Sequence, residues 1–339
     1  MALLSRGNFS GAKILAKDMP KELETYIHEF VGDQLSEKEK RNLKKDILRC
    51  YLSHRFHPSE YFMYDLRRRS FEERGSFLSD LDRWSLLHKK FSQNIHNEIL
   101  DKYVFYQLAQ PFFGREAFKV DGKSKKEDFE AFASRHKHLF VKPLDKFYGI
   151  GTYKLTVGEP YSAAEIFQRL TGSNSGSYIV EELIEQHPAT ASWNESSVNT
   201  LRMPSFIDAK GEHHILVPIF RTGRKGHVVD NAGDGGIFAG VDSKTGKLLS
   251  IGIDKHGGRF EKHPDSGLTF MGWQLPMWQE LVEMCERLHR SLPAHHRYIA
   301  FDFALTPKGW VVVEGNWGQL SGQGPANHGI RKEFIEYIS

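Results

Sequence analysis

The spacing of apolar residues changes near residue 139, and this change restricts the chain to folds that join a helical part to a sheet-containing part. From Pro20 to about Gln107 apolar residues recur every three or four positions, which is typical of amphipathic helices. Beyond residue 139 they gather in short runs bounded by glycine, proline or asparagine, as strands are. We therefore predict an α-helical N-terminal third followed by an α+β region.

Three apolar stripes predict the faces that the N-terminal helices bury. Ser36 and Glu39 form a capping-box pattern that predicts a helix start, and His57 with Pro58 predicts a break after that helix. The stripes are Leu23, Tyr26, Ile27, Phe30 and Val31, then Leu43, Ile47, Leu48, Tyr51 and Leu52, and finally Phe77, Leu81, Trp84 and Leu87.

The rest of the chain predicts strands interrupted by two helices. The strands are expected at 139–142, 178–181, 198–202, 215–221, 298–305 and 310–314, and the helices at 163–170 and 276–292. Residues 222–272 hold many glycines and are interpreted as loop-rich. The pattern favours an α+β fold in which mostly antiparallel hairpins lie beside helices.

Charge and cysteine content exclude several protein classes. The net charge of +3 is too small to select a nucleic-acid partner, and the densest basic run, at 67–69, is interpreted as a solvated surface. Cys50 and Cys285 lie far apart, which argues against a disulfide scaffold. We find no apolar stretch of about 18 residues and no signal-peptide pattern, so we expect a cytoplasmic protein without membrane insertion.

The segment 298–316 carries the most informative pair of carboxylates. A hairpin turn centred on Lys308 would place Asp302 directly opposite Glu314, where two like charges need a shared proton, a cation or open solvent. Asn316 lies two residues further on the same face and adds a third oxygen, which makes the set suitable for Mg²⁺. The alternatives are a solvated hairpin with two exposed acids, or a one-residue register change that separates them.

A second segment combines Lys142, at the end of a predicted strand, with Gly149 and Gly151. A lysine and the backbone N–H groups of a glycine loop can bind a polyphosphate, although a turn and a surface lysine fit the same residues. The stretch 122–124 resembles the end of a P-loop, but Ala117 stands where that motif requires glycine.

Two further predicted strands carry charged residues. Glu181 and Glu182 end one of them, where a backbone hinge could bind an adenine edge and an acid could bind ribose, although an edge strand with solvated acids fits equally well. Asn199 and Arg202 are three residues apart, so on a strand they face opposite sides and one of them is open to a structural role. Arg202 and Arg221 are of the type that holds a transferring phosphoryl group.

Zinc and covalent catalysis are not indicated. The histidine pairs lack HExxH or Cys/His ligand spacing. The sequence has no GxSxG nucleophile motif, and neither cysteine lies in a catalytic motif. These pairs are His136 with His138, His213 with His214, and His295 with His296.

The chemical segments occur in a characteristic order along residues 139–317. They are 140–143, 149–155, 180–182 with 186–188, 197–202, 230–231 with 235–236, 263–267, 301–302 and 314–316. In this order they resemble the ATP-grasp superfamily, and more narrowly its sugar-transfer-associated branch. Residues 101–103 and 105–106 resemble the same branch more loosely.

The resemblance implies an ATP-grasp fold, ATP and Mg²⁺ as cofactors, and roles for individual residues. The implied ATP-binding residues are Lys102, Lys142, Gly149, Gly151, Glu181, Glu182, Ile184 and Asn231, the hinge at 181–184 holding adenine and the loop at 149–151 covering the phosphates. The implied metal ligands are Asp302, Glu314 and Asn316. The implied catalytic residues are Arg202, Arg221 and Asn199, with Arg221, Asn231 and Asp265 expected around the acceptor pocket.

The resemblance also implies a domain division and an activity. We expect a helical domain or cap at 1–100, an ATP-grasp lid at 101–195 and a metal-binding subdomain at 196–339. The implied activity joins a small-molecule carboxylate to an amine, possible substrates being sugar acids, amino acids and amino sugars of polysaccharide or natural-product synthesis. Alternatives are a kinase or ester-forming enzyme with a hydroxyl acceptor, and a non-enzymatic ATP-binding partner of a glycosyltransferase. Many ATP-grasp ligases begin with a Rossmann-like domain instead of helices, so the acceptor site is not carried over.

Overall fold

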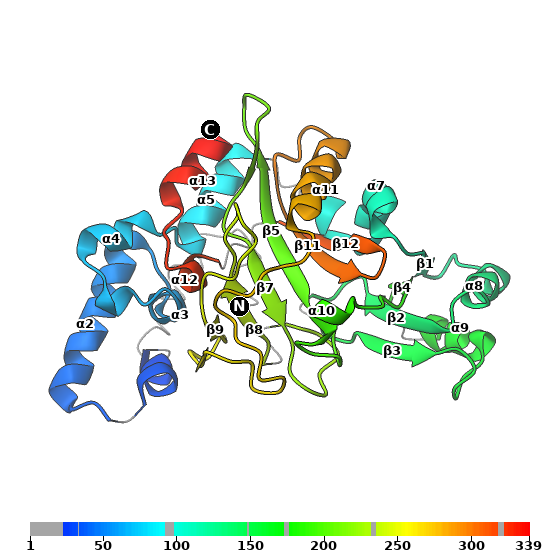
Figure 1. The fold of residues 1–339 in the computed structure, drawn as a ribbon, viewed down its shortest axis with the longest axis horizontal. Helices are drawn as coiled ribbons and strands as arrows, with labels where there is room; N and C mark the ends of the chain where they lie inside the picture. Colours follow the sequence, from blue (N-terminus) through cyan, green and yellow to red (C-terminus); the bar gives the residue numbers. More distant parts are fainter. Residues whose placement is uncertain are drawn as a thin grey trace.

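A computed structural model describes residues 23–32, 34–91, 98–147, 149–172, 176–231, 235–317 and 322–339. The N-terminal helices lie at one end of the molecule, a small sheet at the other, and a large sheet between them (Figure 1). Pro20, where the helical prediction begins, lies outside the described residues. Among the described helices, none combines the length and apolar character needed to cross a bilayer.

The N-terminal helices pack around their own apolar cluster, which includes Ile47, Cys50 and Tyr61. Residues 23–31 are helical, followed by α2 (Glu37–His54), α3 (Pro58–Met63), η1 (Leu66–Arg68), α4 (Phe71–Ser76) and α5 (Asp80–Lys90). The predicted capping box at Ser36 and Glu39 is present, and His57 caps α3 after the predicted break. The helical prediction for this part of the chain is confirmed.

One predicted stripe on α2 is partly wrong. Leu48 and Leu52 were expected in the core, but their exposed fractions are 44% and 72%. The helix buries Leu43, Ile47 and Cys50 instead, at positions i, i+4 and i+7. This face packs against Leu23 and Ile27 of the preceding helix and against Tyr61 of α3, and Leu48 and Leu52 lie outside it and face solvent.

The small sheet has four antiparallel strands in the order β1-β4-β2-β3. Its region contains α7 (Lys102–Phe113), β1 (Ala117–Val120), α8 (Lys126–Ala133), β2 (His138–Pro143), β3 (Tyr153–Thr156), α9 (Ala163–Thr171) and β4 (Tyr178–Glu182). Helices α8 and α9 pack against β1 and each other, and their apolar residues share one core with β2 and β4. The predictions at 139–142, 163–170 and 178–181 are confirmed, whereas β1, β3 and α8 were missed.

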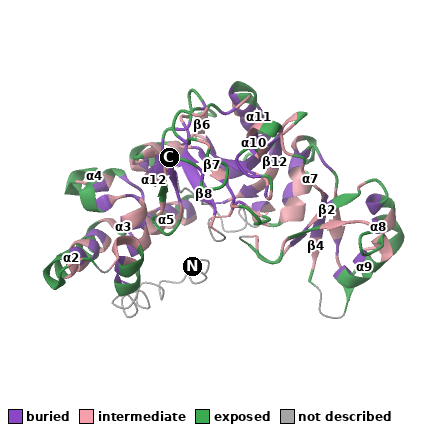
Figure 2. Ribbon diagram, turned by 60° about the horizontal axis from the view of Figure 1, so that its bottom comes forward, coloured by how far each residue is buried: buried purple, intermediate pink, exposed green. Residues whose placement is uncertain are grey.

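The large sheet has the order β10-β9-β8-β7-β5-β11-β12, with β6 paired to β5. Its region contains α10 (Pro188–Ala191), β5 (Thr200–Ile207), β6 (His213–Ile215), β7 (Ile219–Thr222), β8 (Ile237–Gly240), β9 (Gly252–Ile253), β10 (Arg259–Phe260), α11 (Trp278–Ser291), β11 (Tyr298–Thr306), β12 (Gly309–Asn316), α12 (Gln323–Ala326) and α13 (Arg331–Ile338). Strands β5 and β11 are buried almost throughout, and the central strands appear in purple in Figure 2.

Several boundaries in this region differ from the predictions. The expected strand at 215–221 is two strands, because Pro218 has no N–H to donate and the ladder breaks around it. Strand β5 begins at Thr200 and not at residue 198, and α11 begins at Trp278 and not at 276. The stretch 222–272 contains the short strands β8 to β10, so it is less loop-rich than expected. The predicted domain boundaries at 100 and 195 stay a prediction.

Candidate active site

A β-bulge places the two key carboxylates opposite each other. The turn between β11 and β12 has two residues, since Thr306 pairs with Gly309, and the pairing continues without a shift to Phe303 opposite Val312. The register then shifts by one residue, so that Asp302 faces Glu314 and the residue at 313 is extra. The predicted pairing is confirmed, although the predicted turn centre at Lys308 is wrong.

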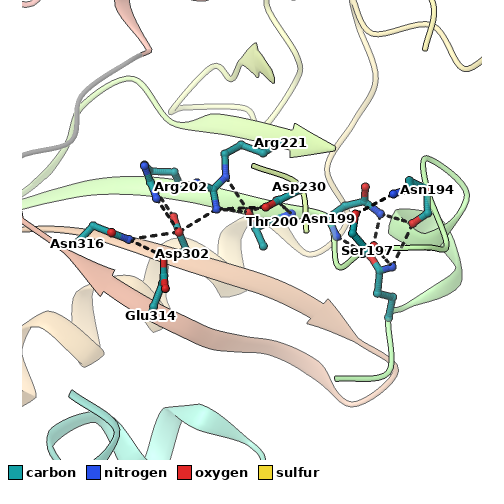
Figure 3. Close-up of polar contacts among 11 residues, drawn as sticks. Asn194, Ser197, Asn199, Thr200, Arg202, Arg221, Asp230, Asp302, Glu314 and Asn316 are labelled. Carbon is teal, nitrogen blue, oxygen red and sulfur yellow. Dashed lines mark hydrogen bonds and ion pairs between the residues drawn. The ribbon is translucent and has the colours of Figure 1, made fainter. Parts of the chain in front are cut away.

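Asp302 is fully buried and held by two arginines from neighbouring strands (Figure 3). Arg202 on β5 donates Nε and Nη2 to its two carboxylate oxygens at 2.8 and 2.7 Å. Arg221 on β7 donates Nη2 to Oδ2 at 2.9 Å. Burial alone would raise the pKa of Asp302, but the charges of Arg202 and Arg221 outweigh it and lower the pKa. Asp302 is therefore an anion at neutral pH.

Glu314 lies in the opposite electrostatic situation. Burial and the facing charge of Asp302 raise the pKa of Glu314, while Lys142 and Arg202 act against that rise. Asn316 donates Nδ2 to Glu314 Oε1 at 3.1 Å and to Asp302 Oδ2 at 3.3 Å. The raised pKa marks a place where an added positive charge would be stabilising.

These three side chains fit a magnesium ion. Two carboxylates and one carboxamide supply hard oxygen ligands, and a divalent cation would replace the proton that Glu314 otherwise favours. Because the amide nitrogen of Asn316 now points at the carboxylates, its oxygen would reach the same ion only after the amide turns over. The structure thus brings Asp302, Glu314 and Asn316 together as the sequence predicted.

Lys142, on β2 of the small sheet, belongs to a buried group of charged side chains with Glu181 and Arg115. Its Nζ donates to Glu181 Oε1 at 2.6 Å, and Arg115 donates Nε and Nη2 to Glu181 Oε2 at 2.9 and 2.6 Å. Burial opposes ionisation of Glu181, but the two cations outweigh it and lower its pKa. Glu181 therefore holds Lys142 in place and faces the interior, away from a solvated strand edge.

Lys102 begins α7 and approaches the same region. It donates Nζ to the carbonyls of Pro143 and Lys146 at 3.0 and 2.6 Å. Burial is the largest influence on Lys102 and lowers its pKa, while the charge of Glu314 raises it and that of Lys142 lowers it. The two predicted phosphate-binding lysines are thus electrostatic neighbours of the metal-ligand set.

The glycine loop between β2 and β3 touches the large-sheet side. Gly149 and Gly151 have φ angles of 71° and 74°, a region that favours glycine. A Cβ atom at Gly149 would lie 3.2 Å from Cγ2 of Val229, which shows how closely the loop approaches the segment after β7. Asn231 lies in that segment, two residues beyond Val229, and its carbonyl accepts the N–H of Gly236 at 3.0 Å.

The hinge residues connect the two sheets. Glu182 ends β4 and its N–H donates to the carbonyl of Glu116, while Ile184 follows, half-buried, in the connecting segment. Further along, the N–H of His187 donates to the carbonyl of Leu305 on β11 at 2.8 Å. The segment 183–187 therefore connects the small sheet to the large one.

Asn199 is not brought to the carboxylates. Its Nδ2 donates to the carbonyls of Thr190 and Asn194 at 2.9 and 2.7 Å and to Gln186 Oε1 at 2.8 Å. In Figure 3 Asn199 lies beside Asn194 and Ser197 and apart from Asp302 and Glu314. This network anchors α10 and the start of β5. A catalytic role for Asn199 stays a prediction.

Residues 162–334, just over half of the chain, match the family described as sugar-transfer associated ATP-grasp. The chain belongs to this ATP-grasp family. A comparison with curated protein sequences gave no match. The two α+β parts with antiparallel sheets are the ATP-grasp fold, preceded in this chain by helices.

Solved structures of ATP-grasp ligases resemble the chain at low identity. The D-alanine-D-alanine ligase from Coxiella burnetii is 9% identical with a TM-score of 0.40, covering 71% of this chain and 58% of its own. The D-alanyl-alanine synthetase A from Vibrio cholerae is 12% identical with a TM-score of 0.40, covering 71% and 64%. The ATP-grasp ligase PsnB with its minimal precursor is 15% identical with a TM-score of 0.44, covering 79% and 71%. The chain therefore spans less than two thirds of the length of the first two ligases.

Three residues of this ATP-grasp site were missed by the sequence predictions. Thr200 accepts Nε and Nη2 of Arg221 at 2.9 and 2.8 Å, and Asp230 accepts the N–H of Thr200 at 3.0 Å. Arg115 joins Glu181 to β12 by donating Nη1 to the carbonyl of Val312 at 2.7 Å. Asp230 and Thr200 lie in the stretches 230–231 and 197–202 that carry the family resemblance, whereas no pattern in the sequence singles out Arg115.

Proposed function

We propose that the protein is an ATP- and Mg²⁺-dependent carboxylate–amine ligase that forms an amide through an acyl phosphate. One observation carries this proposal: Glu314, half-buried on the large sheet, faces Asp302 and is under the electrostatic influence of Lys142 on the small sheet. A metal-ligand set and a phosphate-binding cation from separate sheets thus act on one place, which suits a metal-bound polyphosphate between them.

The residues that would bind ATP come from both sheets. Lys142 and Lys102 would contact phosphate oxygens, and Gly149 and Gly151 would let the loop backbone approach them. The hinge at 181–184 would bind adenine through backbone groups, with Asn231 on the facing segment. Bound Mg²⁺ would neutralise charge on the phosphates, and Asp302, Glu314 and Asn316 would hold it.

Two arginines, Arg202 buried and Arg221 half-buried, would stabilise the reacting groups. Burial opposes the charge of Arg221, but Asp230, Asp302 and Glu314 outweigh it and raise its pKa, so this guanidinium stays charged. Arg202 is oriented by its two bonds to Asp302. Fixed cations of this kind stabilise negative charge that moves between the γ-phosphate and the attacking carboxylate. No protein nucleophile is required, because positioning and charge neutralisation supply most of phosphoryl-transfer catalysis.

The substrates are proposed as small molecules. The family description supports a sugar acid, with an amino acid or amino sugar as the amine, in polysaccharide or natural-product synthesis.

Trapping the intermediate tests the proposal. The protein is incubated with ATP, Mg²⁺, hydroxylamine and pooled sugar acids and amino acids, and the products are read by mass spectrometry. We expect ADP together with a hydroxamate, and neither product from the Glu314→Gln variant. ADP with a phosphorylated hydroxyl compound would instead establish a kinase. No nucleotide turnover with any pool would contradict the ligase proposal.

A further inference from the structure

Three metal-ligand side chains meet near the start of β11, away from the ATP-grasp site. Oε2 of Glu98 lies 3.2 Å from Nε2 of His295 and 2.9 Å from Nε2 of His296. The three ligand atoms all lie within 4.8 Å of one another. We propose that Glu98, His295 and His296 bind one Zn²⁺ ion, with water as the fourth ligand.

The spacing of the ligand atoms suits tetrahedral zinc. Bonds of about 2.1 Å to nitrogen and oxygen separate neighbouring tetrahedral ligands by roughly 3.4 Å. The observed separations of 3.2 and 2.9 Å between Glu98 and the two histidines are slightly shorter. Shifts of a few tenths of an ångström would therefore bring Glu98 to the expected separation from each histidine, and the two histidine nitrogens lie within 4.8 Å of each other.

The backbone that presents these ligands is well anchored. Ile99, next to Glu98, is buried in the main apolar core. His296 is also buried, and its N–H donates to the carbonyl of Pro293 at 2.9 Å, while the N–H of Arg297 donates to the carbonyl of His295 at 3.0 Å. An ion would thus bind side chains that are already held close together.

The site is separate from the magnesium ligands and has a structural consequence. Tyr298 begins β11 and Asp302 follows four residues later, about 13 Å along the strand. Glu98 and His295 are 197 residues apart, which explains why local spacing did not indicate zinc. An ion there would tie the residues that precede α7 to the loop that precedes β11. Metal binding would therefore stabilise the full chain whether or not it is a ligase.

Zinc titration of the metal-free full-length protein tests this site. Binding is followed by competition with a chromophoric chelator in excess Mg²⁺, and by the visible spectrum of Co²⁺ in place of zinc. The variants Glu98→Gln and His295→Ala alter side chains that are 45% and 46% exposed, so both should fold. The control His328→Ala removes an exposed histidine that lies 3.3 Å from Glu333, and Glu314→Gln disables the other metal site.

We expect one zinc equivalent in the wild type and both controls, a tetrahedral Co²⁺ spectrum, and a Tm that rises with zinc. Glu98→Gln and His295→Ala should bind zinc about tenfold or more weakly and lose the Tm rise. Equal zinc affinity in these two variants and the wild type would overturn the proposal, as would a wild type that binds no zinc.

Discussion

Arg115 and Glu181 form a buried ion pair in which both Nε and Nη2 of the arginine donate to one carboxylate oxygen, at 2.9 and 2.6 Å. The same guanidinium donates to the carbonyls of Val312 and Val313 at 2.7 and 3.3 Å, where the β12 bulge interrupts the ladder. Since Glu181 also holds Lys142, one arginine links the lysine of the small sheet to the bulge that orients Glu314. The relative placement of the two halves of the candidate site thus depends on Arg115.

Replacing Arg115 with lysine should therefore be costly. A lysine keeps the charge but loses bonds to buried carbonyls, so we expect a loss of about 1–3 kcal/mol in the free energy of unfolding and weaker ATP binding. Urea unfolding and calorimetric ATP titration measure the two effects. The matched control Arg135→Lys alters an exposed pair with Glu116 and should cost less than about 1 kcal/mol. Equal losses in the two variants would contradict the linking role.

The two facing carboxylates should respond differently to amide substitution. Glu314→Gln removes the repulsion between two like charges, so we expect the fold and its stability to be retained. The same substitution removes a proposed metal ligand, so we expect turnover to be lost. Asp302→Asn leaves Arg202 and Arg221 without their shared anion, and it should destabilise the protein by about 3–5 kcal/mol. Circular dichroism with denaturant titration compares them. Full activity in Glu314→Gln would remove Glu314 from the metal site.

Stability should depend on pH through Glu314. Its folded pKa lies above the ordinary value of 4.5, so the folded state binds the proton more tightly than the unfolded state. The resulting stabilisation is fully present below that ordinary value and is lost as pH rises through the folded pKa. Relative to Glu314→Gln, the wild type should therefore become less stable on going from acidic to neutral pH. Denaturant titrations of both proteins across this range, without Mg²⁺, measure the difference, and parallel curves would contradict the raised pKa.

Gly149 offers a test of the loop that faces Val229. Gly149→Ala should weaken ATP binding severalfold, because the added Cβ would meet Val229 at 3.2 Å in a backbone conformation that favours glycine. Gly158→Ala is the matched control, since Gly158 also has a positive φ but nothing within 4 Å of the added atom. Both variants should lose similar stability, of the order of 1 kcal/mol. Equal ATP affinity in the two variants would argue against the loop role.

Local sequence patterns predicted which carboxylates face each other, but they did not predict the contacts between residues far apart in the sequence. The facing of Asp302 and Glu314 followed from strand alternation, yet it was reached by assuming a turn centred on Lys308. The real turn is centred between Pro307 and Lys308, half a residue before the expected centre. The bulge adds one residue to β12 and so restores the expected pairing of Asp302 with Glu314. A run of valines does not mark where a bulge will form, so the pairing was correct because the shorter turn and the extra residue at 313 offset each other.

Arg115 and Glu98 were missed for a different reason. Arg115 contacts Glu181, which is 66 residues away in the sequence, and Glu98 contacts His295, which is 197 residues away. Such pairs are created by sheet order and by the packing of connecting segments, and neither is encoded in the spacing of residues along the chain. Asn199 and Arg202 are only three residues apart and have separate partners, which agrees with the opposite faces expected from strand alternation.

The extra residue at 313 also decides what the loss of one residue from this hairpin would change. Deleting Val313 would make β12 regular and would keep Glu314 opposite Asp302, because the pairs on both sides of the bulge would then follow one register. The carbonyl of Val313, which accepts Nη2 of Arg115, would be lost with the residue. A related chain that is one residue shorter at this point should therefore keep the facing carboxylates and lose part of the link to the small sheet.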